Sequence, residues 1–131
     1  TIFSLLSMSN ITIMIIGDST AEQQFRSLLC MFESVNASLV PGSNYFDQFI
    51  PNRSVHIYFN WMTKIDSTES VVKSTLQRHP TNNTLFILMG FGPWYQENRD
   101  ELFAHLKTFT HWWRAYAEKF LSDLWMAFGA W

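Results

Sequence analysis

Short apolar runs alternate along the chain with longer segments in which apolar residues recur every three or four positions. Three runs stand out: ITIMII (Ile11–Ile16), VHIYFNW (Val55–Trp61) and TLFILM (Thr84–Met89). The first is too short and too rich in β-branched residues to be a buried helix, and all three are predicted to be strands.

The segments between and after these runs predict three helices. The first spans about Thr20–Ser34, where apolar residues follow helical spacing. The second begins near Asp66, which with Glu69 resembles a capping box, and stops before Pro80. The third is the long amphipathic stretch from about Arg99 to Leu124. The alternation of strand and helix predicts an α/β fold with a parallel sheet covered by helices.

Two segments are predicted to be loops. Residues 35–54 contain two prolines, a glycine and several Asn and Ser, and loops of that length are often functional. Gly42 in this segment is either a backbone donor for a site or a turn residue beside Pro41. The second loop, GFGPWYQEN, covers residues 90–98.

Composition and charge narrow the class of protein. The 131 residues are 47% hydrophobic and 17% aromatic, which suits one packed domain over residues 1–131. A net charge of −2 gives no electrostatic footprint for nucleic acid or an anionic membrane. The apolar runs are too short to span a bilayer, and no basic segment typical of a signal peptide precedes them.

Glycosylation sequons favour the lumen of the secretory pathway, because Asn10, Asn36, Asn52 and Asn82 are all acceptors in form. Cys30 is the single cysteine, and a buried free thiol is expected there. The chain has no spacing of residues typical of a zinc site, so neither metal nor cofactor is predicted.

Gly17, Asp18 and Ser19 follow the first predicted strand, and Gly90 and Gly92 follow the third. Because the carboxyl ends of parallel strands meet at one edge of a sheet, both groups are expected on the same rim. A serine at a helix N-terminus gains from the helix dipole and from free N–H groups that stabilise an oxyanion. The alternative is that Gly-Asp-Ser forms only a turn and an N-cap.

Three blocks of the sequence resemble the trichome birefringence-like family of polysaccharide O-acetyltransferases, in the PC-esterase branch of the SGNH (GDSL) hydrolase superfamily. IIGDSTAEQQFRSLLCMF resembles the first block of the family, an apolar strand followed by Gly-Asp-Ser and a helix with Gln-Trp, Ser-Leu and a cysteine. VHIYFNW resembles the second strand, and TLFILMGFGPWY resembles the third block. The matching residues are Gly17, Asp18, Ser19, Gln24, Phe25 (Trp in the family), Ser27, Leu28, Cys30, Trp61, Gly92 and Trp94.

The resemblance implies a three-layer α/β/α SGNH-like parallel sheet, incomplete on its C-terminal side, and transfer or hydrolysis of acetyl groups on polysaccharides in the Golgi or secretory lumen. Ser19 would be the nucleophile and Asp18 a supporting residue. The N–H groups of Ser19 and of Gly92 or Gly90 would bind the oxyanion. The resemblance specifies neither the glycan nor the acetyl donor.

Aromatic residues near this rim are candidates for stacking on a sugar ring. Trp94 and Tyr95 follow the third strand, and Trp61 ends the second. For Trp94 and Tyr95 the alternative is that the loop folds back and anchors them in the core. The stripe of Trp112, Trp113 and Trp125 along the last helix is expected to pack against the sheet.

The chain departs from the family at the catalytic base. The family takes its base and orienting group from an Asp-x-x-His motif, which does not occur in these 131 residues. The chain reaches LWMAFGAW where a further strand and the last catalytic loop are expected, and Gly90 stands in place of the oxyanion asparagine of the family.

None of the four histidines is an obvious substitute for the catalytic histidine of that motif. His56 and His79 belong at the beginnings of strands, at the opposite edge from Ser19. His105 is the remaining base candidate, about 9 Å along a helix that begins at Arg99; otherwise it is a surface or packing residue. His111 lies on another face of that helix.

Three other hypotheses about the function stay open. One is a non-catalytic carbohydrate-binding or interaction protein on the same scaffold, and another is a general GDSL-type esterase or lipase. The third is a partial product without a function of its own.

Overall fold

The structure of the chain is a computed structural model. It describes residues 6–35, 37–41, 46–78, 83–91, 95, 98–120 and 124–128. In this part of the chain the strands are β1 (Ile11–Gly17), β2 (Val40–Pro41), β3 (Asp47–Ile50), β4 (Val55–Trp61), β5 (Thr84–Gly90) and β6 (Leu124–Phe128). The α-helices are α2 (Ser19–Ser34), α3 (Thr68–Leu76) and α4 (Arg99–Phe120), and two short 3₁₀ turns are η1 (Pro51–Arg53) and η2 (Ile65–Ser67).

The strands form one mixed sheet in the order β2-β3-β4-β1-β5-β6. The three predicted strands are β1, β4 and β5, and they run parallel to one another, with β6 also parallel to β5. From β1 the chain moves first to β4 on one side and then to β5 on the other side. The order of the parallel strands therefore reverses between β1 and β5, and in open α/β sheets ligands bind beyond the carboxyl ends of the strands at this switch point.

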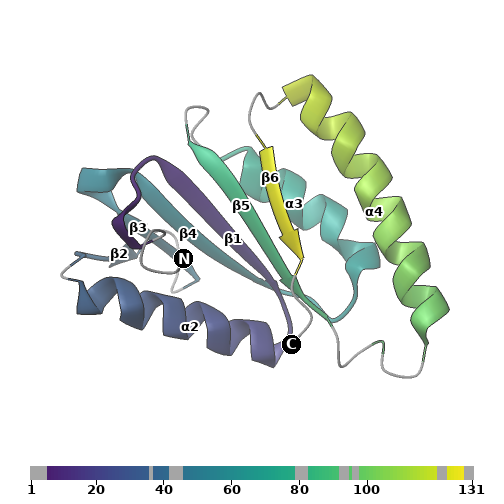
Figure 1. The fold of residues 1–131 in the computed structure, drawn as a ribbon, viewed down its shortest axis with the longest axis horizontal. Coiled ribbons are helices and arrows are strands. Elements are labelled where there is room, and N and C mark those ends of the chain that lie inside the picture. Colours follow the sequence, from purple (N-terminus) through teal and green to yellow (C-terminus); the bar gives the residue numbers. More distant parts are fainter. Residues whose placement is uncertain are drawn as a thin grey trace.

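Helices cover both faces of the sheet, as Figure 1 shows with α2 on one side and α3 and α4 on the other. Side chains of β1 alternate between the two layers. Ile13 packs in the cluster that includes Phe25 of α2, whereas Met14 packs in the cluster that includes Val72 of α3 and Trp113 of α4. The α/β class predicted from the sequence is confirmed, and the arrangement has three layers.

The loop predicted over residues 35–54 is wrong in part. This segment contains β2 and β3, which pair antiparallel with each other, and β3 also pairs antiparallel with β4, so the sheet is mixed and not purely parallel. Phe46, just before β3, packs against Phe25 and Phe59 with ring centroids 6.0 and 5.2 Å apart. Partial burial of this ring and the pairing of β3 with β4 stabilise an edge that the local sequence, with two prolines, does not indicate.

The predicted end of the last helix is also wrong. α4 ends at Phe120, and Leu124–Phe128 form β6 along β5. Trp125 therefore lies in a strand and does not continue the aromatic stripe of the helix. Trp113 of that stripe is 1% exposed and stacks on Phe109, so its packing toward the sheet is confirmed. An apolar run such as LWMAF fits either a helix or a strand, and only the free edge of β5 selects the strand.

Candidate functional site

The junction between β1 and α2 brings two elements very close together. A Cβ atom added to Gly17 would lie 2.3 Å from the carbonyl oxygen of Gly90 and 2.6 Å from the Cβ atom of Ala21. No side chain fits in that space, so glycine is required for β1, β5 and the first turn of α2 to meet. The carbonyl of Gly17 in turn accepts a hydrogen bond from the N–H of Met62, 2.8 Å away.

Asp18 is the N-cap of α2. Its side chain is buried, and Oδ1 accepts hydrogen bonds from the N–H groups of Thr20 at 3.0 Å and Ala21 at 3.4 Å. Such caps stabilise a helix by about 1 kcal/mol. Asp18 therefore fills the N-cap role that the alternative interpretation gave to Gly-Asp-Ser. The capping role does not involve the side chain of Ser19.

Ser19 is the first residue of α2, and its side chain is exposed. Its N–H is one of the first four that a helix leaves without an intrahelical acceptor, and the side chain of Asp18 does not accept from it. The positive end of the dipole of a 16-residue helix lies at this serine. An exposed hydroxyl beside its own N–H, the one donor of this helix end that Asp18 does not engage, is part of the arrangement that acyl transfer uses.

The surrounding rim is formed by the ends of three neighbouring strands. Gly17 ends β1, Gly90 ends β5 beside it, and Trp61 ends β4 on the other side, in register with Gly17. Trp61 is 53% exposed, so its ring is accessible at this edge. Gly92 and Trp94, the other residues expected here, lie outside the described residues.

Asn60 is a rim residue that the sequence reasoning missed. Its Nδ2 atom is buried and has no hydrogen-bond partner among the residues that the structure describes. It lies in register with Ile16, next to Trp61. A lone asparagine in a strand carries no sequence signal, and only its buried, unpaired donor singles it out.

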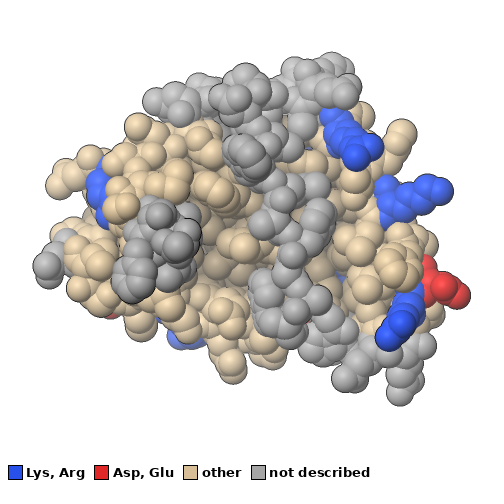
Figure 2. Space-filling model, in the orientation of Figure 1, with Lys and Arg blue, Asp and Glu red and all other residues tan. Residues whose placement is uncertain are grey.

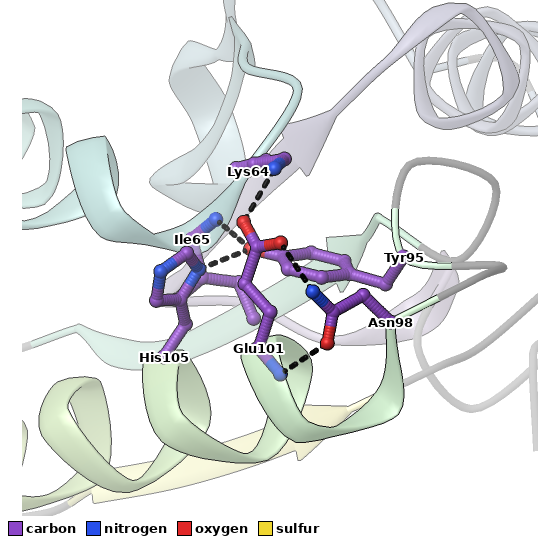
Figure 3. A network of polar contacts seen from close by, with 6 residues as sticks. All are labelled: Lys64, Ile65, Tyr95, Asn98, Glu101 and His105. Carbon is purple, nitrogen blue, oxygen red and sulfur yellow. Dashed lines mark hydrogen bonds and ion pairs between the residues drawn. The ribbon is translucent and has the colours of Figure 1, made fainter.

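Tyr95 anchors the segment after β5 and is 3% exposed. Its hydroxyl oxygen accepts from the N–H of Ile65, 2.8 Å away, and lies 2.7 Å from Nδ1 of His105 (Figure 3). The rings of Tyr95 and His105 meet edge to face at 5.6 Å. The loop-anchor alternative therefore describes Tyr95, and its ring is not open for stacking on a sugar.

A second set of contacts holds the beginning of α4. Glu101 forms an ion pair with Lys64, and its N–H donates to Oδ1 of Asn98 at 3.0 Å. The Nδ2 of Asn98 donates to the Glu101 carboxylate at 3.3 Å, and the Lys64 ammonium lies 5.7 Å from the centre of the Tyr95 ring. Figure 3 shows these residues joining the segment after β4, the segment after β5 and α4.

Burial raises the pKa of the Tyr95 hydroxyl above its ordinary value. The N–H of Ile65 acts in the opposite direction, and the carboxylates of Asp66 and Glu101 add to the increase. The hydroxyl therefore stays protonated at neutral pH, so it carries a proton for its contact with Nδ1 of His105.

None of the described histidines is brought to Ser19. His56 lies at the other end of the sheet, in register with Thr12, as predicted, and burial lowers its pKa despite the nearby Asp47. His105 lies on α4, which covers the opposite face from α2, and its Nδ1 is engaged by Tyr95. His111 is exposed on the outer side of α4, and His79 lies outside the described residues.

Cys30 is exposed, so the expected buried thiol is wrong. α2 buries Phe25, Leu28, Leu29 and Phe32, and the next residue after Leu29 is turned about 100° away from that face. Among the described residues no group of three or more His, Cys, Asp or Glu could hold a metal ion. No described helix has the length and apolar character that crossing a bilayer requires.

Replacing Tyr95 with Phe should lower the free energy of unfolding by about 2 kcal/mol, because the N–H of Ile65 and Nδ1 of His105 lose a buried partner while the ring stays in place. Urea denaturation followed by circular dichroism measures this loss. Tyr116→Phe, at a partly buried ring on the same helix layer, is the control. A Tyr95→Phe protein as stable as the parent would show that the hydroxyl contacts contribute nothing.

Comparison of the chain with protein-family models, curated proteins and solved structures gave no match.

Proposed function

We propose that the chain carries a serine nucleophile for transfer or hydrolysis of acetyl groups on polysaccharides, on an SGNH-type α/β/α scaffold similar to the trichome birefringence-like and PC-esterase proteins. The observation that carries this proposal is the position of Ser19. Its exposed hydroxyl stands at the N-terminus of α2, at the carboxyl edge of β1, beside the point where the strand order reverses.

The chemistry proceeds in two steps. The Ser19 Oγ attacks the acetyl carbonyl, its proton passes to a base, and the alcohol of the donor ester leaves with a proton returned by that base. The acetyl–Ser19 bond is then broken by a sugar hydroxyl in transfer or by water in hydrolysis. The Ser19 N–H and the helix dipole stabilise the oxyanion in both steps.

Ser19 has no base among the described residues, and the Asp-x-x-His pair of the similar family does not occur in the sequence. A general base contributes about 10²–10⁴-fold to such a reaction. The chain by itself is therefore expected to react slowly, and a base supplied in solution should raise its rate.

The test is acetylation by p-nitrophenyl acetate, with and without added imidazole, read out as acetylated peptide by mass spectrometry. Imidazole should raise the rate of acetylation of Ser19 about tenfold, as partial replacement of a general base. Ser19→Ala should remove the acetylated peptide. Ser27→Ala, at an exposed serine of the same helix two turns further on, should leave it unchanged.

Equal acetylation of Ser19 and Ser27 in the folded parent protein would show that the helix N-terminus does not activate Ser19. Adding soluble polysaccharide after acetylation separates the two activities, because transfer gives an acetylated glycan and hydrolysis gives acetate. Faster reaction with longer acyl esters than with acetyl esters would instead favour a general GDSL-type esterase or lipase.

The exposed ring of Trp61 favours a second candidate, a non-catalytic carbohydrate-binding protein on the same scaffold. In that case Trp61→Ala would weaken binding of a polysaccharide, while Ser19 would stay unacetylated even with imidazole present. The same acetylation experiment therefore decides between the two functions.

A further inference from the structure

The outward face of α4 carries a row of residues that the proposed serine chemistry does not use. Phe103, Lys107, Thr110 and Arg114 are spaced by four, three and four positions, which places them in one line along the helix. This line is about 16 Å long. Together with His111 these residues line a surface depression of about 680 Å³. We refer to these five residues as the α4 row.

The aromatic ring of the row is unusually open. Phe103 is 64% exposed, more than any other large hydrophobic residue that is described. A different face of the helix, about 80–120° around its axis from Phe103, supplies Trp113 and Phe109 to the core. Packing of α4 on the sheet therefore does not explain a phenylalanine at position 103.

The cations of the row have no ion pair or side-chain hydrogen bond with a described residue, a property that they share with Arg99 but not with the cations that precede α4 in the described chain. The ion pairs are Arg26–Glu22, Lys64–Glu101, Lys73–Glu69 and Arg78–Asp47. The guanidinium of Arg53 donates to the carbonyls of Leu6 and Met8. No such contact with a described residue engages Lys107 or Arg114.

Figure 2 shows Lys and Arg side chains spread along the side of the molecule where α4 lies, with an acidic group toward one end. Asp100, in the first turn of α4, is exposed and seven residues before Lys107, about 10 Å along the axis. The row thus presents one aromatic ring at its first position and positive charge further along the helix to the solvent.

We propose that the α4 row binds a linear, carboxylate-bearing polysaccharide lying along the helix. Lys107 and Arg114 face successive carboxylates, His111 and Thr110 hydrogen-bond to polar groups of the sugars, and the face of one sugar ring packs on Phe103. The charges of the row support binding of an anionic polymer whether or not the proposed function holds. The choice of a polysaccharide as that polymer rests on the proposed function.

Two other anionic partners fit the row less well. A membrane surface requires a broad apolar face on the helix, and the row offers a single phenylalanine. A nucleic acid is disfavoured because the net charge of the chain is −2. Proteins that bind nucleic acids rely on much larger basic surfaces. A polymer of sugar rings uses the aromatic ring and the cations together.

The test is binding of polygalacturonate to the purified chain by isothermal titration calorimetry at low and moderate salt. Lys107→Gln with Arg114→Gln should weaken binding about tenfold, the sum expected for two exposed charge contacts. Phe103→Ala should weaken it about fivefold and more salt should weaken it further. Arg26→Gln with Lys73→Gln, which removes the same charge from paired cations, should change binding less than twofold.

Ser19→Ala should leave the affinity unchanged, so failure of the serine chemistry and failure of this proposal are separate results. No binding of polygalacturonate by the parent, or equal loss in both double variants, would overturn the α4 row as a binding surface. Equal affinity for single-stranded DNA of the same charge, or for neutral galactan, would overturn its assignment to an acidic polysaccharide.

Discussion

Gly17→Ala should lower the free energy of unfolding by about 3 kcal/mol, among the largest effects of any single methyl group in the chain. The added Cβ atom would lie 2.3 Å from the carbonyl oxygen of Gly90. This oxygen belongs to the backbone of β5, which is held in register against β1, so it cannot move without breaking the sheet. Chemical denaturation followed by far-ultraviolet circular dichroism measures the loss.

A second variant separates the two contacts that the methyl group makes. In Gly17→Ala with Ala21→Gly, the contact at 2.6 Å to the Ala21 Cβ atom is removed, but the contact to Gly90 remains. The double variant should therefore stay unstable, and the glycine in α2 should itself cost about 1 kcal/mol. A free energy of unfolding for Gly17→Ala within about 0.5 kcal/mol of that of the parent would contradict the close approach of β1 and β5 in the structure.

Phe25→Ala should lower the free energy of unfolding by about 4 kcal/mol, a large part of the 5–15 kcal/mol typical of a domain. The Phe25 ring is fully buried, and its centroid lies 6.0 Å from that of Phe46 and 5.7 Å from that of Phe59. Its loss leaves a cavity between α2, the segment before β3 and β4. Urea denaturation gives the change in stability.

Phe103→Ala is the matched control for this substitution. It makes the same change within an α-helix, but at a ring that is 64% exposed, and it should alter stability by less than about 0.5 kcal/mol. Equal effects of the two substitutions would contradict the packing of α2 against the sheet.

The parallel part of the fold could be predicted because each of its strands has a strong local signal. The predicted bounds of β4 agree with the structure, and those of β1 and β5 differ only by the final glycine of each strand. Buried strands of a parallel sheet consist of continuous apolar runs, and β-branched residues are frequent in ITIMII. The beginning of α2 at Ser19 follows from Asp18, whose side chain caps the helix.

The antiparallel edge could not be predicted, because its stability comes from residues distant in the sequence. β3 has only four residues, and its ladder with β4 and the burial of Ile50 fix it. The end of α4 was missed for a related reason, since the apolar run after it fits both kinds of secondary structure until β5 offers a free edge.

The candidate site likewise contains residues that the sequence predicts and residues that it does not. Ser19 and the rim formed by Gly17, Gly90 and Trp61 follow from the rule that sites lie at the carboxyl ends of parallel strands. The roles of Tyr95 and Asn60 depend on which polar atoms are buried and with which partners. Those partners come from other elements, such as Ile65 and His105 for Tyr95, so no local pattern reveals them.

The central claim is that Ser19 reacts as a nucleophile because it stands at the N-terminus of α2 on the rim of the sheet. Labelling of the folded protein with a fluorophosphonate probe in the presence of imidazole, with the labelled peptide identified by mass spectrometry, tests this most directly. The label should be found on Ser19 and should disappear in Ser19→Ala. A folded protein that stays unlabelled, or that carries the label equally on Ser27, would contradict the claim.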